Sequence, residues 1–169
     1  MIQTKIILFT FLVFSILSCK KDKVEVINID QEMFNLSQGT TNFTFYKKSN
    51  DLLEKGSGSG HNYPFLKTKY NQIASTMLDS NGKVKENAIF PEGSLIVKEL
   101  YNDETTIGRF AVLYKKSGDE NADAKGWIWG YINSDKSVAV AASQKGGSCI
   151  SCHSQSGNID YMLMNAFHP

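Results

Sequence analysis

Apolar side chains in the second half of the chain gather in four short stretches, at residues 94–101, 109–115, 127–132 and 138–142. Stretches of this length that are rich in aliphatic and aromatic residues and bounded by polar turns predict β-strands. Residues 109–115 are apolar at both alternating sets of positions, which indicates a strand that is buried on both faces and lies in the middle of its sheet. The short polar connections favour an antiparallel meander.

Aromatic residues line one side of the third predicted strand. Trp127, Trp129 and Tyr131 recur at every second position, so in a strand their side chains point to the same face. Large aromatic side chains contribute much of the apolar area of a core. We therefore interpret this stripe as core packing on one face of the sheet.

The first half of the chain has weaker patterns. Residues 66–77 carry apolar side chains at helical spacing, which predicts a helix that ends in the turn at residues 80–82. Residues 43–46 fit a short strand, and residues 51–55 fit one helical turn. The Gly-Ser segment 56–60 predicts a flexible linker between an N-terminal stub and the main domain.

The N-terminus has the three parts of an export signal. Lys5 precedes an apolar run at residues 6–17, and the small residue Ser18 follows that run. The run is too short for a membrane-spanning helix, which needs about 20 apolar residues. The order Ile-Leu-Ser before Cys19 resembles a bacterial lipobox, which implies cleavage before Cys19 and lipidation of that residue. The alternative is an ordinary signal peptide followed by an incidental cysteine.

Both alternatives predict an exported chain, and the lipoprotein alternative divides it into three regions. Residues 1–18 form a signal peptide of the lipoprotein type, residues 19–59 a lipid-anchored tether and short stub, and residues 60–169 the folded domain. The lipobox resemblance implies several acyl chains, which hold a protein at a membrane firmly, whereas one chain holds it only marginally. We expect the mature protein in the bacterial periplasm or at the outer membrane.

The composition excludes two broad classes of protein. The chain of 169 residues is 41% hydrophobic and 21% charged, which excludes a disordered chain. Because Lys5 is one of the 18 basic residues, removal of the leader leaves 17 basic and 17 acidic residues. A chain with balanced charge lacks the basic face that nucleic acids require, so we expect no nucleic-acid partner.

The candidate chemistry is concentrated near the C-terminus, where residues 149–153 read Cys-Ile-Ser-Cys-His. The pattern Cys-x-x-Cys-His is typical of covalent c-type haem attachment. Cys149 and Cys152 would reach the two vinyl groups on one edge of the porphyrin, and the next residue would present an imidazole to the iron. We therefore predict one covalent haem c, with thioethers at both cysteines and His153 as the proximal iron ligand.

Three other uses of this cysteine pair stay open. A disulfide oxidoreductase places Cys-x-x-Cys at the start of a helix in a βαβ unit, for which the 17 residues after Cys152 leave no room. A structural zinc site needs four ligands, and apart from His153 the chain has His61 and His168 but no second cysteine pair. A disulfide between Cys149 and Cys152 would close a small, strained ring.

The sixth ligand position of such a haem has several candidates. Met162 and Met164 follow His153 too closely to reach the opposite face of the haem, since a helix through His153 and Met162 rises about 13 Å on one side. His61 follows the Gly-Ser segment and can swing in as a distal ligand. An open, five-coordinate iron is the expectation that the sequence favours.

Four segments together resemble the cytochrome P-460 family, whose relatives include the β-rich cytochromes c-prime. They are Phe-Pro-Glu-Gly-Ser-Leu-Ile-Val-Lys-Glu at residues 90–99, Gly-Trp-Ile-Trp at 126–129, the haem motif, and Asp-Tyr at 160–161. The resemblance spans about residues 60–169. It implies an α+β fold with an antiparallel sheet, flanking helices and a C-terminal covalent haem c site. It also implies His153 as the proximal ligand and, often, a homodimer.

The family resemblance implies two kinds of distal chemistry. Some members carry a lysine bonded to the haem and oxidise hydroxylamine, whereas others have an apolar distal pocket and bind nitric oxide or similar gases. Lys98, Lys67 and Lys69 are candidates for such a lysine, and Glu92 and Glu99 are nearby acids for proton transfer. The simplest interpretation of Lys98 is a surface position, because an amine is costly to bury. In a strand, Glu99 points the opposite way.

These patterns lead to three functional hypotheses. The first is an exported, lipid-anchored mono-haem cytochrome whose open iron binds small nitrogen oxides or diatomic gases. The second is a six-coordinate electron carrier that serves a separate redox partner. The third is an oxidoreductase that oxidises hydroxylamine or nitric oxide.

Overall fold

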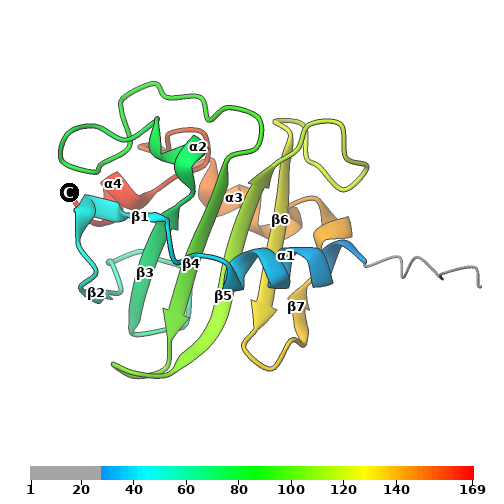
Figure 1. The fold of residues 1–169 in the computed structure, drawn as a ribbon, viewed down its shortest axis with the longest axis horizontal. Coiled ribbons are helices and arrows are strands. Elements are labelled where there is room, and N and C mark those ends of the chain that lie inside the picture. The colour runs from blue at the N-terminus through cyan, green and yellow to red at the C-terminus, as the bar shows by residue number, and fades with distance from the viewer. Residues whose placement is uncertain (1–27) are drawn as a thin grey trace, which may run out of the picture.

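The computed structural model describes residues 28–169, and a seven-stranded antiparallel sheet organises this part of the chain (Figure 1). The strands are β1 (Thr44–Phe45), β2 (Leu53–Glu54), β3 (Phe65–Tyr70), β4 (Leu95–Tyr101), β5 (Ile107–Lys115), β6 (Trp127–Asn133) and β7 (Val138–Val140). Their order is β1-β3-β4-β5-β6-β7, and β2 also pairs with β3. The predicted signal peptide and the lipidation site at Cys19 lie outside the described residues.

Helices cover both faces of the sheet. They are α1 (Ile29–Gln38), α2 (Gln72–Ser75), α3 (Gly147–His153) and α4 (Met164–Phe167), with 3₁₀ turns at Tyr46–Lys48 and Ala142–Gln144. Figure 1 shows α1 across one face of the sheet, with α3 and α4 on the other. The predicted α+β class, an antiparallel sheet with flanking helices, is confirmed. None of the helices in residues 28–169 is long and apolar enough to cross a membrane.

The strand predictions in the second half of the chain are confirmed. Residues 94–101, 109–115 and 127–132 coincide with β4, β5 and β6, and β5 lies between the other two, as its two apolar faces predict. Trp127 and Trp129 lie buried in the core on one face of the sheet. The two tryptophans of the stripe therefore have the predicted packing role, and Tyr131 is partly buried against the same core.

The helix predicted over residues 66–77 is wrong. Strand β3 occupies its first half and pairs along its whole length with β4, and the helical residues are Gln72–Ser75. Leu66 and Tyr70 are four residues apart, a spacing that also places them on the same face of a strand, where both are buried. Backbone pairing with β4 therefore outweighs the helical spacing. The helical turn predicted at residues 51–55 is also wrong, because this segment contains β2.

Helix α1 lies in the segment that the sequence assigns to a polar tether and stub. Asn28 begins the helix, and its side-chain oxygen accepts a hydrogen bond from a first-turn backbone N–H at 2.8 Å. Met33 and Phe34 are buried against the sheet. The described part of residues 19–59 therefore packs onto the domain, and the Gly-Ser segment 56–60 belongs to the loop between β2 and β3.

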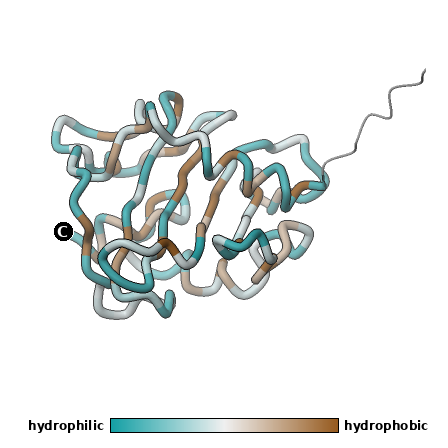
Figure 2. The backbone as a smooth tube through the Cα atoms, turned by 60° about the horizontal axis from the view of Figure 1, so that its bottom comes forward, coloured by the Kyte–Doolittle hydropathy of each residue, from teal (hydrophilic) through white to brown (hydrophobic). Residues whose placement is uncertain are grey.

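Two apolar cores lie on opposite faces of the sheet. The first core joins α1 to β4, β5 and β6 and includes the fully buried side chains of Met33 and Ile128. The second core joins the other face to α2 and C-terminal residues, around Tyr70, Phe90 and Trp127. Figure 2 shows hydrophobic positions concentrated on the central strands and hydrophilic ones in the loops. Alternation along the central strands therefore sends successive side chains into different cores.

The α1 core predicts a stability effect. Because Met33 is fully buried, Met33→Ala should lower the free energy of unfolding by about 2–5 kcal/mol through lost packing and a residual cavity. The matched control is Ile89→Ala, at a side chain that is 75% exposed. It should stay within about 0.5 kcal/mol of the parent. Urea titration followed by circular dichroism measures both, and equal midpoints for the two variants would contradict the buried position of Met33.

Candidate haem site

Helix α3 presents the Cys-x-x-Cys-His residues on one side. Cys149, Cys152 and His153 are at positions i, i+3 and i+4, which are neighbours on a helix surface. The chain enters α3 through Gly146, whose φ of +81° favours glycine, and a Cβ there would lie 2.8 Å from the indole nitrogen of Trp129. This close approach packs the start of α3 against β6. Both thiols are free in the structure.

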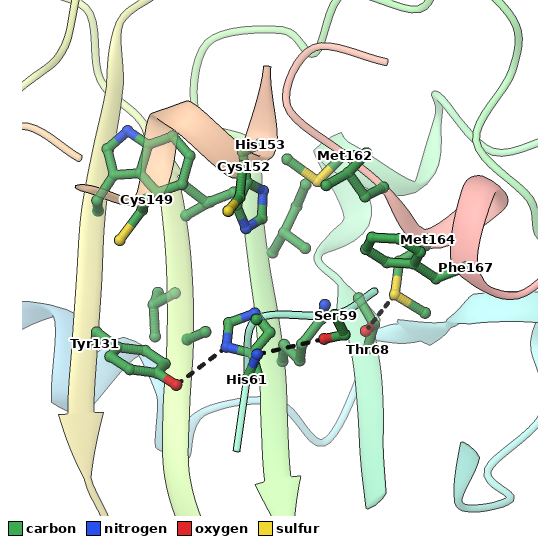
Figure 3. Close-up of a pocket in the computed structure, with 18 of the residues that line it drawn as sticks. Ser59, His61, Thr68, Tyr131, Cys149, Cys152, His153, Met162, Met164 and Phe167 are labelled. Carbon is green, nitrogen blue, oxygen red and sulfur yellow. Dashed lines mark hydrogen bonds between the residues drawn. The ribbon is translucent and has the colours of Figure 1, made fainter. Parts of the chain in front are cut away.

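A pocket of about 260 Å³ lies between α3 and the sheet (Figure 3). Strands β3 to β6 supply one wall, and α3, residues 58–61 and residues 162–164 contribute others. Apolar side chains, among them Ile96, Ala111 and Leu113, make up most of its lining. Both cysteines and the histidine of the motif line the same pocket. The structure therefore brings the predicted thioether and proximal-ligand residues together.

A backbone carbonyl orients the ring of His153. Its Nδ1 lies 2.7 Å from the carbonyl oxygen of Tyr161, so Nδ1 carries the proton and donates, and Nε2 keeps a free lone pair. The Trp129 ring packs edge-on against the imidazole, with 5.2 Å between the ring centroids. Burial lowers the pKa of His153 and keeps the ring neutral. A neutral, oriented imidazole with a free Nε2 is what metal ligation requires.

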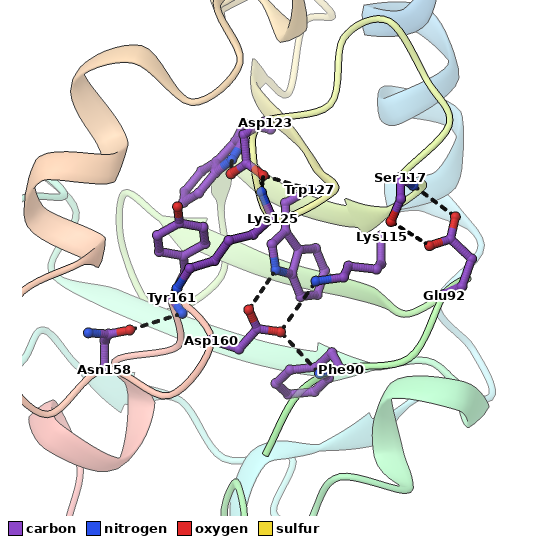
Figure 4. Close-up of polar contacts among 11 residues, drawn as sticks. Phe90, Glu92, Lys115, Ser117, Asp123, Lys125, Trp127, Asn158, Asp160 and Tyr161 are labelled. Carbon is purple, nitrogen blue, oxygen red and sulfur yellow. Dashed lines mark hydrogen bonds and ion pairs between the residues drawn. The ribbon is translucent and has the colours of Figure 1, made fainter. Parts of the chain in front are cut away.

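Polar contacts around Asp160 hold the segment that carries this carbonyl (Figure 4). Asp160 accepts hydrogen bonds from the Trp127 indole at 3.2 Å and from the Phe90 backbone N–H at 3.0 Å. It also pairs with the Lys115 ammonium at 3.5 Å. Asp160 and Tyr161 have φ values of +47° and +72°, a conformation that non-glycine residues keep when their surroundings enforce it. The Asp160 contacts therefore fix the carbonyl that orients the histidine of α3.

His61 lies across the pocket from His153, with 6.3 Å between the ring centroids and 73° between the ring planes (Figure 3). The Nδ1 of His61 is 3.1 Å from the Tyr131 hydroxyl. Burial, followed by the charge of Lys98, lowers the pKa of His61 to about 3, so the ring is neutral. The distal candidate and the predicted proximal ligand thus share one pocket.

Lys98 also lines the pocket, so its expected surface position is wrong. Burial lowers the pKa of this amine to about 8. Two of the other catalytic candidates, Lys67 and Glu92, lie elsewhere. Lys67 donates a hydrogen bond to Asn50 at 2.9 Å, and Glu92 accepts hydrogen bonds from the backbone and hydroxyl of Ser117 (Figure 4). Lys98 is therefore the member of this set that the structure brings to the haem motif.

Glu99 and Lys69 pair with each other away from the pocket. The Lys69 ammonium lies 2.5 Å from one carboxylate oxygen of Glu99, and the second oxygen accepts a hydrogen bond from Tyr101 at 2.8 Å. Mutual pairing is how two largely buried charges are tolerated. Glu99 points away from Lys98, as strand alternation predicts, and the Lys69–Glu99 pair has no part in the pocket lining.

Several residues of the pocket carry no chemical motif in the sequence. Tyr131 bonds to His61, and its signal is the two-residue period shared with Trp129, which places it on the pocket face. The contribution of Tyr161 is a backbone carbonyl, which side-chain patterns do not reveal. Met162 also lines the pocket, together with the cysteines and the histidine of the motif that precedes it in the chain.

The available donor groups fit a covalent haem better than a bare metal ion. Within residues 28–169, no group of three or more histidine, cysteine, aspartate or glutamate side chains is arranged to hold a metal ion. By contrast, two thiols and an oriented imidazole on one helix, facing a mostly apolar pocket, are the elements of c-type attachment. The geometry of the pocket therefore agrees with the interpretation of the motif.

Comparison with known proteins gives the family of the chain. Residues 61–164 match the family model described as Cytochrome P460. The matched segment includes His61, Lys98 and the whole Cys-x-x-Cys-His motif. No curated protein and no solved structure matches the chain. Because the family match covers more than half of the sequence, this chain belongs to the cytochrome P460 family of haem proteins.

Proposed function

We propose that this protein is a mono-haem c-type cytochrome in which Cys149 and Cys152 form thioethers with the porphyrin and His153 binds the iron. The observation that carries the proposal is that these three side chains share one face of α3 and line one pocket. Each thioether forms by addition of an S–H group across a vinyl double bond, so attachment consumes neither an oxidant nor a reductant. Held by these residues, a haem would supply an iron with accessible ferrous and ferric states.

The residues around the pocket define the ligands that this haem can take. The Tyr161 carbonyl keeps the proton of His153 on Nδ1, which makes Nε2 a more basic ligand. Ile96, Ala111 and Leu113 make much of the facing wall apolar. Pocket polarity and access decide which small molecules a haem binds. We therefore propose diatomic gases or small nitrogen oxides as ligands, with redox chemistry at the iron.

The leader supports an exported, lipid-anchored protein. A lipid on Cys19 and two thioethers on Cys149 and Cys152 would use all three cysteines of the chain and leave no thiol to oxidise. Covalent attachment also suits an exported protein, because it prevents loss of the cofactor outside the cytoplasm. We propose a location in the periplasm or at the outer membrane, with the polar residues after Cys19 as the tether.

Lys98 supports a second candidate function, the oxidation of hydroxylamine. The family resemblance implies that members with this activity carry a lysine bonded to the haem. In this chain, Lys98 lines the pocket. No ion pair within residues 28–169 involves Lys98. Because its pKa is lowered to about 8, a share of the amine is uncharged near neutral pH, and the uncharged form is the nucleophile.

The haem proposal predicts the fate of the pigment in cysteine variants. Protein made with a c-type maturation system should keep its colour through acid–acetone extraction, because thioethers survive this treatment. Cys149→Ala/Cys152→Ala should lose all covalent haem, measured as pyridine haemochrome per mole of protein. Ser151→Ala, an exposed position between the two cysteines, is the control and should keep the parent's haem content. Extraction-resistant pigment in the double variant would end the proposal.

The hydroxylamine candidate predicts a peptide cross-link through Lys98. Joining its nitrogen to a ring carbon removes two protons and two electrons, so hydrogen peroxide is supplied and becomes water. The linking rate should rise with pH and level off above about 8, because the deprotonated amine reacts and its pKa is about 8. Mass spectrometry of protease digests should show the Lys98 peptide joined to the haem peptide. Lys98→Met should abolish the link and Lys67→Met should keep it, and the reverse result would exclude this candidate.

A further inference from the structure

The two histidines of the pocket are arranged as a pair. Each ring has its Nδ1 turned to another partner, the Tyr131 hydroxyl for His61 at 3.1 Å and the Tyr161 carbonyl for His153 at 2.7 Å. Figure 3 shows the rings facing one another across the pocket. A hydroxyl accepts as well as donates, so Tyr131 permits the tautomer of His61 that has its proton on Nδ1. In that state both rings turn a free Nε2 lone pair to the space between them.

The separation of the rings distinguishes two ways in which they can interact. With ring bonds of about 1.35 Å, a ring atom lies roughly 1.15 Å from the centroid. A direct hydrogen bond of about 2.9 Å between facing Nε2 atoms would set the centroids about 5.2 Å apart. A single metal atom with two bonds of about 2.0 Å would set them about 6.3 Å apart. The observed separation of 6.3 Å fits one atom held between the two nitrogens.

We propose that His61 is the second axial ligand of the haem iron, opposite His153, and that small external ligands bind by displacing it. The proposal rests on the proposed function, because it requires a haem attached through α3. It replaces the open, five-coordinate iron that the sequence favours with a six-coordinate resting state. It also predicts that an incoming ligand binds on the His61 side of the haem.

The supports of the two histidines differ, and this makes His61 the ligand that leaves. His153 is part of α3, next to the attachment cysteines. His61 is in the loop between β2 and β3, which is closed at its base by a hydrogen bond from the Lys55 N–H to the Pro64 carbonyl at 2.8 Å. Segment 56–60 of this loop contains three glycines, and glycine-rich backbone has many accessible conformations. Release of His61 therefore requires movement of a loop and leaves the sheet in place.

Contacts with α4 keep the loop near the pocket when the ring moves. A Cβ at Gly56 would lie 2.7 Å from the Cβ of Phe167, and one at Gly58 would lie 3.6 Å from its ring. The first half of the loop is thus packed against the C-terminal helix. Within residues 28–169, the His61 ring makes one hydrogen bond, to the Tyr131 hydroxyl. A released His61 therefore stays close enough to rebind and compete with an external ligand.

The test uses the haem-loaded full chain, with carbon monoxide as the probe. The parent should have a low-spin ferric spectrum, and its rate of carbon monoxide binding to the ferrous form should reach a plateau set by release of His61. His61→Ala should be high-spin, and its binding rate should rise linearly with ligand concentration. Its affinity for carbon monoxide should increase about tenfold or more, because the binding-competent fraction is no longer limiting. A parent that is high-spin, or a low-spin His61→Ala, would overturn the proposal.

Two further variants separate ligation from a folding defect. His168→Ala removes a histidine outside the pocket lining and should match the parent in spin state and carbon monoxide binding. Tyr131→Phe removes the partner of His61 but keeps the ligand, so it should stay low-spin and bind carbon monoxide about threefold faster. Loss of the low-spin signal in His168→Ala alone would also overturn the proposal. Haem staining on a denaturing gel reports attachment independently, so a parent without covalent haem would refute the proposed function instead.

Discussion

The sheet has two apolar faces, and the need to remove both from water explains most of the architecture. Helix α1 covers one face with Met33 and Phe34. Helix α2 and the C-terminal residues cover the other face, around Phe90 and Trp127. The pocket forms on this second face, where α3 and the sheet leave space between them. Its floor is apolar for the same reason that the rest of this face is, since burial of apolar surface drives folding.

Strand β4 shows how the sheet couples structure and site. Its alternation directs Glu99 to a buried pair with Lys69, so the neighbouring residue Lys98 must point to the pocket. The carboxylate of Glu99 is thus paired with Lys69, and the amine of Lys98 is left in the pocket with His61 and His153. Burial lowers the pKa of both His61 and His153, and the charge of this amine lowers each of them further. The electrostatics of the pocket therefore follow in part from a pairing on the far side of the sheet.

The sequence predicts the strongest elements of this protein and misses those that depend on tertiary context. Strands β4 to β6 are short apolar stretches bounded by polar turns, a pattern that favours strands, and the Cys-x-x-Cys-His spacing identifies the motif without knowledge of the fold. The pattern of residues 66–77 is ambiguous because the spacing of Leu66 and Tyr70 suits a helix and a strand equally, and backbone pairing with β4 favours the strand. The pocket position of Lys98 and the carbonyl of Tyr161 depend on packing between distant segments, which local patterns do not contain.

The proximal wall of the pocket is built from residues that follow strands β1 to β7 in the chain. The last of these strands ends at Val140, and α3, which carries residues 149–153, adds no strand to the sheet. Asp160 ties the residues after α3 to the sheet side of the pocket through the Trp127 indole and the Phe90 backbone. Since neither contact is part of a strand pair, this wall can separate from the sheet and close again without breaking the backbone pairing of the strands.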